Sequence, residues 1–80
     1  MSQHEILSPL PGTFYRKPAP DADPFVQEGS KIQVGDVIGL VEVMKMFNEV
    51  HSDVSGTVLK CLVENEDPVE SGQALMLVQP

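Results

Sequence analysis

Short runs of apolar and β-branched residues recur along the chain, and each begins directly after a glycine-containing turn. The runs occupy residues 13–15, 37–43, 57–59 and 74–78. Runs of this length that start at turn residues are typical of β-strands, and a series of them is typical of a compact sandwich or barrel. The pattern therefore predicts an all-β fold.

These runs belong to an internal repeat. An offset of 37 positions places residues 26–42 over residues 63–79, and an offset of 44 positions places residues 8–16 over residues 52–60. The same two blocks occur twice in the same order, which indicates two similar halves. We expect the halves to pack around a pseudo-twofold axis, with each half supplying one sheet that covers the apolar face of the other.

Residues 39–50 also fit a different element. On a helix, one face of this segment would carry four apolar side chains, those of Leu40, Val43, Met44 and Phe47. The repeat partner of its first part, residues 74–79, is too short for a typical helix, which favours strand, turn, strand. The amphipathic helix remains the alternative.

The first half carries an insertion between its two blocks, because the two offsets differ by seven positions. It lies at residues 17–24, KPAPDADP, where three prolines remove backbone donors and fix φ. This composition excludes a central strand or a helix and predicts a stiff, protruding loop. Such a loop is either a plain surface insertion or a functional finger.

Length and charge narrow the class of protein. Eighty residues form one domain, residues 1–80, and the net charge of −7 disfavours nucleic acid and membrane surfaces while favouring basic protein partners. Residues 1–5 are polar, so we expect a disordered tail there rather than a signal peptide. Cys61 is the only cysteine, which predicts a buried structural thiol and a reducing, cytoplasmic location.

Residues 43–51, VMKMFNEVH, lie between the two copies, and we expect no counterpart to them elsewhere in the chain. The centre of this predicted hairpin is Met44-Lys45-Met46, without the Gly, Asn or Asp that turns normally use. If the turn is tight, Met44 or Lys45 should have positive φ. Lys45 is then either an ordinary solvated charge or an amine displayed for acylation, with two adaptable methionines for a partner's pocket.

Three segments resemble one known family. Residues 39–50, GLVEVMKMFNEV, resemble the biotin-attachment sequence of biotin carboxyl carrier domains, whose hallmark is Met-Lys-Met. Residues 8–16 look like the opening strand of the acetyl-CoA carboxylase carrier of bacteria, and residues 18–22 look like its protruding thumb. The resemblance implies a flattened barrel of two four-stranded antiparallel sheets with pseudo-twofold symmetry. It also implies a lysine at a hairpin tip and termini at the far end.

The resemblance also implies roles for individual residues. Lys45 matches the lysine that receives biotin through an amide bond. The residues that match recognition positions for the biotin ligase and other partners are Glu42, Val43, Met44, Met46 and Glu49. The thumb would comprise Lys17, Pro18, Ala19, Pro20, Asp21 and Ala22. Val43 and Lys17 depart from the family pattern, which most often has Ala and Thr at these positions.

A carrier of this family has no catalysis of its own. Biotin on Lys45 would take a carboxyl group from a biotin carboxylase to a carboxyltransferase, giving malonyl-CoA for fatty acid biosynthesis. We expect no catalytic residues and no metal site, since His4 and His51 join no nucleophile or ligand set. The location would be the cytoplasm, or the plastid stroma if a transit peptide has been removed.

Other functions remain open. The domain could serve another biotin-dependent carboxylase or decarboxylase, carry lipoic acid in a 2-oxo-acid dehydrogenase, or act as an unmodified interaction module. The remaining lysines match no attachment site and are expected in the loop base (Lys17), a turn (Lys31) and a strand (Lys60).

Overall fold

The computed structural model describes residues 3–80, which form eight β-strands and no helix. The strands are β1 (His4–Leu7), β2 (Gly12–Tyr15), β3 (Lys31–Ile32), β4 (Val37–Val43), β5 (Met46–His51), β6 (Gly56–Cys61), β7 (Pro68–Val69) and β8 (Ala74–Gln79). The helical alternative for residues 39–50 is therefore wrong, because β4 and β5 occupy this segment as an antiparallel pair. Within residues 3–80, nothing forms a helix long and apolar enough to cross a membrane.

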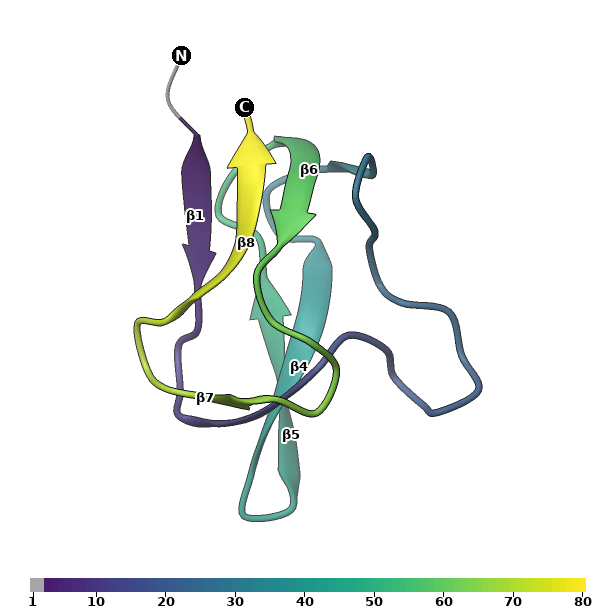
Figure 1. Ribbon diagram of the computed structural model, residues 1–80, viewed down its shortest axis with the longest axis vertical. Helices are drawn as coiled ribbons and strands as arrows, with labels where there is room; N and C mark the ends of the chain where they lie inside the picture. Colours follow the sequence, from purple (N-terminus) through teal and green to yellow (C-terminus); the bar gives the residue numbers. More distant parts are fainter. Residues whose placement is uncertain (1–2) are drawn as a thin grey trace.

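The strands form two antiparallel sheets of four strands each. One sheet has the order β1-β8-β6-β3, and the other has the order β5-β4-β2-β7. Figure 1 shows β1, β8 and β6 side by side in the first sheet. The prediction of an all-β fold with two four-stranded sheets is confirmed.

The internal repeat relates the two sheets to each other. An offset of 44 positions relates β1 to β5 and β2 to β6, and an offset of 37 relates β3 to β7 and β4 to β8. Replacing each strand by its counterpart converts the order of the first sheet into that of the second, which is the predicted pseudo-twofold symmetry.

Each sheet, however, contains two strands from each half of the chain. The expectation that each half supplies its own sheet is therefore wrong. The interleaving has a physical reason, since β4 and β8, which have the most buried patterns, each obtain a hydrogen-bonded neighbour on both sides. The halves are thus joined by backbone ladders as well as by the core.

Two expectations at the start of the repeat are corrected. Residues 46–51 do have a counterpart, since β5 corresponds to β1. His4 and Glu5 belong to β1, which pairs with β8, so the predicted tail of residues 1–5 is wrong at these two positions. Residues 1–2 lie outside the described part of the chain. The strand was missed because β1 is an edge strand that buries only Ile6.

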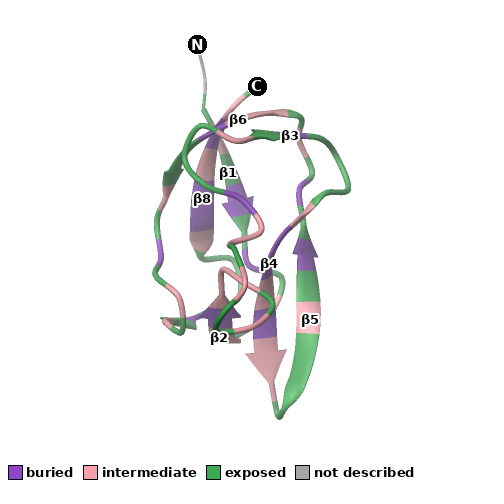
Figure 2. Ribbon diagram, turned by 90° about the vertical axis from the view of Figure 1, so that its right-hand side faces the viewer, coloured by how far each residue is buried: buried purple, intermediate pink, exposed green. Residues whose placement is uncertain are grey.

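The core lies between the two sheets, and the repeat-related strands bury equivalent positions (Figure 2). Its fully buried large side chains are Phe14, Ile38, Leu75, Met76, Val41, Val58 and Val78. The symmetry is broken at one place, where β4 has Gly39 and β8 has Met76. A Cβ atom on Gly39 would lie 2.5 Å from Cε1 of Phe14, so the glycine leaves room for the aromatic ring.

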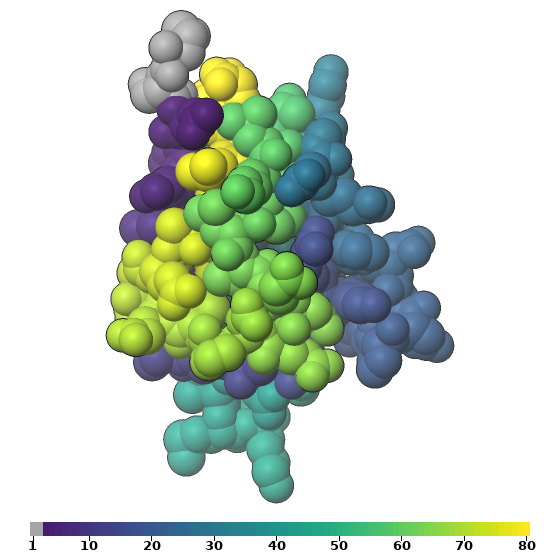
Figure 3. Space-filling model, viewed as in Figure 1, coloured from purple at the N-terminus to yellow at the C-terminus, as the bar shows by residue number. Residues whose placement is uncertain are grey.

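The β4–β5 hairpin lies at the opposite end of the molecule from the C-terminus and the start of β1 (Figure 1). In the space-filling view, the hairpin tip projects from one end, and the segment between β2 and β3 projects from one side (Figure 3). The candidate functional site described below lies at these two projections.

Candidate functional site

A two-residue turn forms the tip of the β4–β5 hairpin. The last paired residues are Val43 and Met46, which leaves Met44 and Lys45 between the strands. Both have positive φ, 51° for Met44 and 67° for Lys45, as predicted for a tight turn. Hairpins of this length favour turns with positive φ at both central residues, because these match the twist of the strands. Neither residue is glycine, so the turn stores backbone strain.

The side chains around this turn are exposed. Met44 is 91% exposed, Met46 is 70% exposed and Phe47 is 58% exposed, although all three are large and apolar. Lys45 is also exposed, and its amine has no hydrogen bond or ion pair within residues 3–80. The hairpin tip therefore exposes the Lys45 amine, without a partner in residues 3–80, among apolar side chains that do not belong to the hydrophobic core.

The predicted recognition residues divide between surface and core. Glu42 pairs with Phe47 and Leu40 pairs with Glu49, so both carboxylates lie at the same face of the sheet as diagonal neighbours. Val43 differs, because it lies on the opposite face of β4 and packs against the core. The carboxylates and both methionines are accessible to a partner, whereas Val43 supports the hairpin from inside.

Sequence reasoning missed Tyr15, which lies on β2 beside the hairpin. Its hydroxyl donates a 2.9 Å hydrogen bond to Oε1 of Glu42, and its ring packs against Phe47 with centroids 5.5 Å apart. The hydrogen bond to Glu42 raises the pKa of Tyr15, with smaller contributions from desolvation and from the charges of Glu42 and Glu66. The residue types gave no signal for this contact, which depends on the pairing of β2 with β4.

The insertion forms the predicted protruding loop. Its base is closed by the hydrogen bond from the Phe25 amide to the Arg16 carbonyl, at 2.9 Å. Its tip contains a turn in which the Ala22 amide donates to the Ala19 carbonyl, at 3.1 Å. Lys17, at the base, donates from Nζ to the Pro20 carbonyl at 3.3 Å. The loop is thus held by local hydrogen bonds and by its prolines.

A groove of about 310 Å³ separates this loop from the hairpin. Its lining residues come from three segments: Lys17, Pro18, Ala19 and Pro20 from the loop, Tyr15 and Phe47 from the sheet, and Asn65 and Glu66 from the β6–β7 connection. Asp21 and Ala22 of the predicted thumb are not among them. The groove opens beside Phe47, two residues from Lys45.

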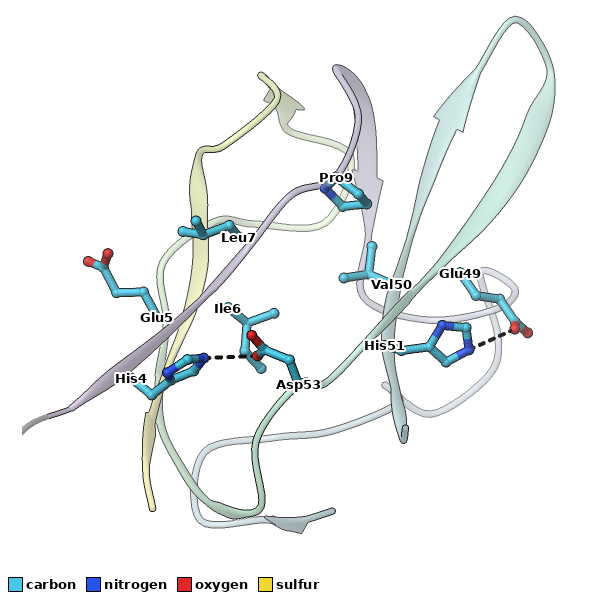
Figure 4. Close-up of a pocket in the computed structure, with 9 residues that line it drawn as sticks. All are labelled: His4, Glu5, Ile6, Leu7, Pro9, Glu49, Val50, His51 and Asp53. Carbon is cyan, nitrogen blue, oxygen red and sulfur yellow. Dashed lines mark hydrogen bonds and ion pairs between the residues drawn. The ribbon is translucent and has the colours of Figure 1, made fainter. Parts of the chain in front are cut away.

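A larger cavity, about 480 Å³, lies along the edge strands β1 and β5 (Figure 4). Among its lining residues, Nε2 of His4 lies 2.9 Å from Oδ1 of Asp53, and Nε2 of His51 lies 3.3 Å from Oε1 of Glu49 on the same strand (Figure 4). No residue of the Met44 to Met46 tip lines this cavity. Within residues 3–80, no three His, Cys, Asp or Glu side chains are placed to hold a metal ion.

Three other positions test the sequence interpretation. Lys31 begins β3 rather than lying in a turn, while Lys60 lies in β6 as predicted. Cys61 is half-buried rather than buried, and it accepts a 3.3 Å hydrogen bond from Nη2 of Arg16. Burial raises the pKa of the Cys61 thiol, and the nearby Arg16 charge opposes this. A thiol in this state is a poor nucleophile at neutral pH.

A family model described as "Biotin-requiring enzyme" matches residues 4–78. The chain belongs to this family of biotin-requiring enzymes. The match covers all eight strands apart from the last residue of β8, and it includes the hairpin and the protruding loop.

Curated relatives in this family come from bacteria and plastids. The chain is 47% identical over 76 residues to the biotin carboxyl carrier protein of acetyl-CoA carboxylase from Nostoc sp., covering 95% of this chain and 42% of that one. It is 39% identical over 79 residues to the carrier of the same name from Haemophilus influenzae, covering 99% and 51%. A chloroplastic carrier from Arabidopsis thaliana is 47% identical over 75 residues, covering 94% and 27%. The chain thus spans about half or less of the length of these relatives.

Among solved structures, the crystal structure of Kluyveromyces lactis urea carboxylase matches with a TM-score of 0.81 and 26% identity. The match covers 99% of this chain and 6% of that one. The two-sheet fold therefore occurs as a small part of a much larger protein.

The residues of the hairpin fit the cofactor for which the family is named. Amide formation with a carboxylic acid requires a primary amine that is accessible and not held in an ion pair. Lys45 meets both conditions within the described residues, and the turn holds its backbone in one conformation. The neighbouring groove offers apolar walls at Pro18, Pro20 and Phe47.

Proposed function

We propose that Lys45 carries biotin through an amide bond and that the chain is the carrier domain of an acetyl-CoA carboxylase. The observation that carries the proposal is the strained hairpin turn that presents the Lys45 amine between exposed Met44 and Met46. The 39–47% identity to relatives named as carriers of acetyl-CoA carboxylase supports the choice of enzyme. In this proposal the domain catalyses no step itself.

The chain's own residues fix the position of the attachment lysine and determine how far its side chain can extend. The two-residue turn fixes where the Lys45 side chain starts, while its four-carbon stem remains free to move. Bound biotin supplies a ureido nitrogen that accepts and releases a carboxyl group. Tethering makes each encounter with an active site intramolecular, at an effective concentration on the order of millimolar for a flexible link. Weak docking of the domain is therefore sufficient.

Three protein partners follow from this role: a biotin ligase, a biotin carboxylase and a carboxyltransferase that forms malonyl-CoA for fatty acid synthesis. A net charge of −7 favours basic docking surfaces on these enzymes and raises encounter rates more than lasting affinity. Met44 and Met46 offer adaptable apolar contacts, and Glu42 and Glu49 offer acceptors beside them. The bacterial and chloroplastic relatives support a cytoplasmic or stromal location.

A second candidate is the carrier domain of another biotin-dependent carboxylase. The structural match to urea carboxylase favours it, although the identity of 26% is lower than that to the acetyl-CoA carboxylase carriers. The two candidates share the modified lysine and differ only in the enzyme that unloads the carboxyl group.

A carboxyl-transfer assay separates these candidates. The biotinylated chain is incubated with biotin carboxylase, ATP and labelled bicarbonate, then with an acetyl-CoA-specific carboxyltransferase or a urea-specific one. We expect labelled malonyl-CoA with the first transferase and no labelled product with the second. Label transfer to urea alone would overturn the assignment to acetyl-CoA carboxylase. The chain with Lys45→Arg provides the background in both reactions.

A further inference from the structure

Tyr15 connects two strands at the base of the hairpin. It pairs in register with Leu40 of β4, while Glu42 pairs with Thr13, so Tyr15 and Glu42 are diagonal neighbours on one sheet face. From this position the Tyr15 hydroxyl donates to Oε1 of Glu42 at 2.9 Å. Glu42 lies three residues before Lys45, and this hydrogen bond fixes its carboxylate relative to the tip.

The ring of Tyr15 also packs against the ring of Phe47. Phe47 pairs with Glu42 across the hairpin, and its ring lies 5.5 Å from the Tyr15 ring at an interplanar angle of 60°. One side chain on β2 therefore contacts two facing side chains, one on each strand of the hairpin. Tyr15 is half-buried, whereas Phe47 is 58% exposed.

Only one oxygen of Glu42 is used in this arrangement. Oε1 accepts from Tyr15, and Oε2 has no hydrogen-bond partner within residues 3–80. A glutamate with one oxygen hydrogen-bonded to its own domain and the other free is pre-ordered for a donor on a docking protein, which lowers the entropic cost of binding. The Tyr15 hydroxyl is protonated, and so able to donate, throughout the neutral range, because a tyrosine has an ordinary pKa of about 10 and the pKa of Tyr15 is raised above it.

We infer that Tyr15 is a positioning residue for the biotin ligase: it orders the Glu42 carboxylate and the Phe47 ring so that a cationic side chain of the ligase meets Glu42 beside Lys45. This inference rests on the proposed function. Tyr15 touches neither the reacting amine nor the cofactor in this role. Its effect is on docking and therefore on KM rather than on kcat.

Glu49 supplies the matched comparison. It lies on the same sheet face, diagonal to Glu42, but its contact is with His51 of its own strand at 3.3 Å. Within residues 3–80, no hydrogen bond joins Tyr15 to Glu49. A change at Tyr15 should therefore be coupled to Glu42 and independent of Glu49.

The experiment measures steady-state biotinylation of the chain by a biotin ligase, with the carrier chain as the varied substrate. For Tyr15→Phe we expect KM to rise about 3-fold to 10-fold with kcat unchanged, the range that loss of one ordinary intramolecular hydrogen bond gives. Glu42→Gln should raise KM similarly, and adding Tyr15→Phe to it should change KM no further. In a Glu49→Gln background, Tyr15→Phe should keep its full effect.

The outcomes are distinguishable. Circular dichroism and thermal unfolding show whether each variant keeps the fold, and Tyr15→Phe retains the aromatic ring that packs against Phe47. An unchanged KM for folded Tyr15→Phe, or equal effects in the Glu42→Gln and Glu49→Gln backgrounds, would overturn the inference alone. Failure of the ligase to modify the wild-type chain would overturn the proposed function and this inference with it.

Discussion

Ser8 and Ser52 make the same hydrogen bond in the two halves of the molecule. Each hydroxyl donates at 2.6 Å to the carbonyl two residues later, Leu10 or Val54, and each serine is at least 97% buried. Their backbone bonds are equivalent as well, since the amides of Gly72 and Gly35 donate to their carbonyls at 2.8 Å. The pseudo-twofold symmetry therefore extends to buried polar contacts.

We expect Ser8→Ala and Ser52→Ala each to destabilise the domain by about 1–3 kcal/mol, because each leaves a part-buried carbonyl without its hydroxyl donor. Ser52→Ala should have the larger effect, since Oγ of Ser52 also accepts from the Val54 amide at 3.2 Å. The two contacts lie in separate halves, so their effects should add in the double variant. Urea unfolding measures both free energies, with exposed Ser71→Ala as the control. A loss confined to one serine would contradict the equivalence of the halves.

The close approach of Phe14 to Gly39 gives a second prediction. Gly39→Ala places a methyl group 2.5 Å from Cε1 of Phe14, and overpacking of this kind costs about 1–3 kcal/mol. The same change should cost less in a Phe14→Leu background, where the ring is absent. Unfolding free energies of the four proteins in this cycle test the coupling. Equal costs in both backgrounds would show that the ring is not what excludes a side chain at position 39.

The positive φ values of the turn predict that one substitution will raise the stability of the fold and weaken recognition by the biotin ligase. Asn tolerates the left-handed region, so Met44→Asn should stabilise the fold by up to about 1 kcal/mol and raise the melting temperature by a few degrees. It also removes an exposed methionine, so KM for the biotin ligase should rise. Met46 is paired in β5 and has no positive φ, so Met46→Asn should not stabilise. A lower melting temperature for Met44→Asn would contradict the strain argument.

The hydrogen bond of Tyr15 makes its titration informative, because it is the only tyrosine in the chain. Its pKa is raised above the ordinary value of 10.0, so phenolate absorbance should appear at higher pH than in the unfolded chain. Above pH 10 the folded state binds more protons than the unfolded state, and the stability that Tyr15 contributes is lost as pH rises. Glu42→Gln should move the midpoint back toward 10. A midpoint unaffected by Glu42→Gln would show that this carboxylate is not the cause.

Much of this fold could be predicted from the repeat, and the errors have identifiable causes. The repeat located strands in both halves and placed Lys45 at a hairpin tip, with positive φ where turn residues are missing. It did not show that each sheet mixes the halves, because strand partners far apart in the chain leave no trace in periodicity. β1 was missed because an edge strand buries a single residue, Ile6.

Some residues of the candidate site could also be identified before the structure was known, and one could not. Lys45, Met44 and Met46 are recognisable from the missing turn residues at the hairpin tip, whereas the two glutamates came from the family resemblance. The structure gathers both carboxylates at one sheet face. Tyr15 was not recognisable, since its contact with Glu42 depends on the register of β2 against β4, which a shift of one residue would abolish. Contacts set by register need coordinates.

The measurement that tests the central claim most directly is the intact mass of the chain after incubation with biotin ligase, ATP and biotin. We predict that the wild-type chain gains the mass of one biotinyl group and that Lys45→Arg gains none. Lys60→Arg, a change at another exposed lysine, should still gain one group. An unshifted mass for the wild-type chain, or a biotinyl group retained by Lys45→Arg, would contradict the assignment of Lys45 as the attachment site.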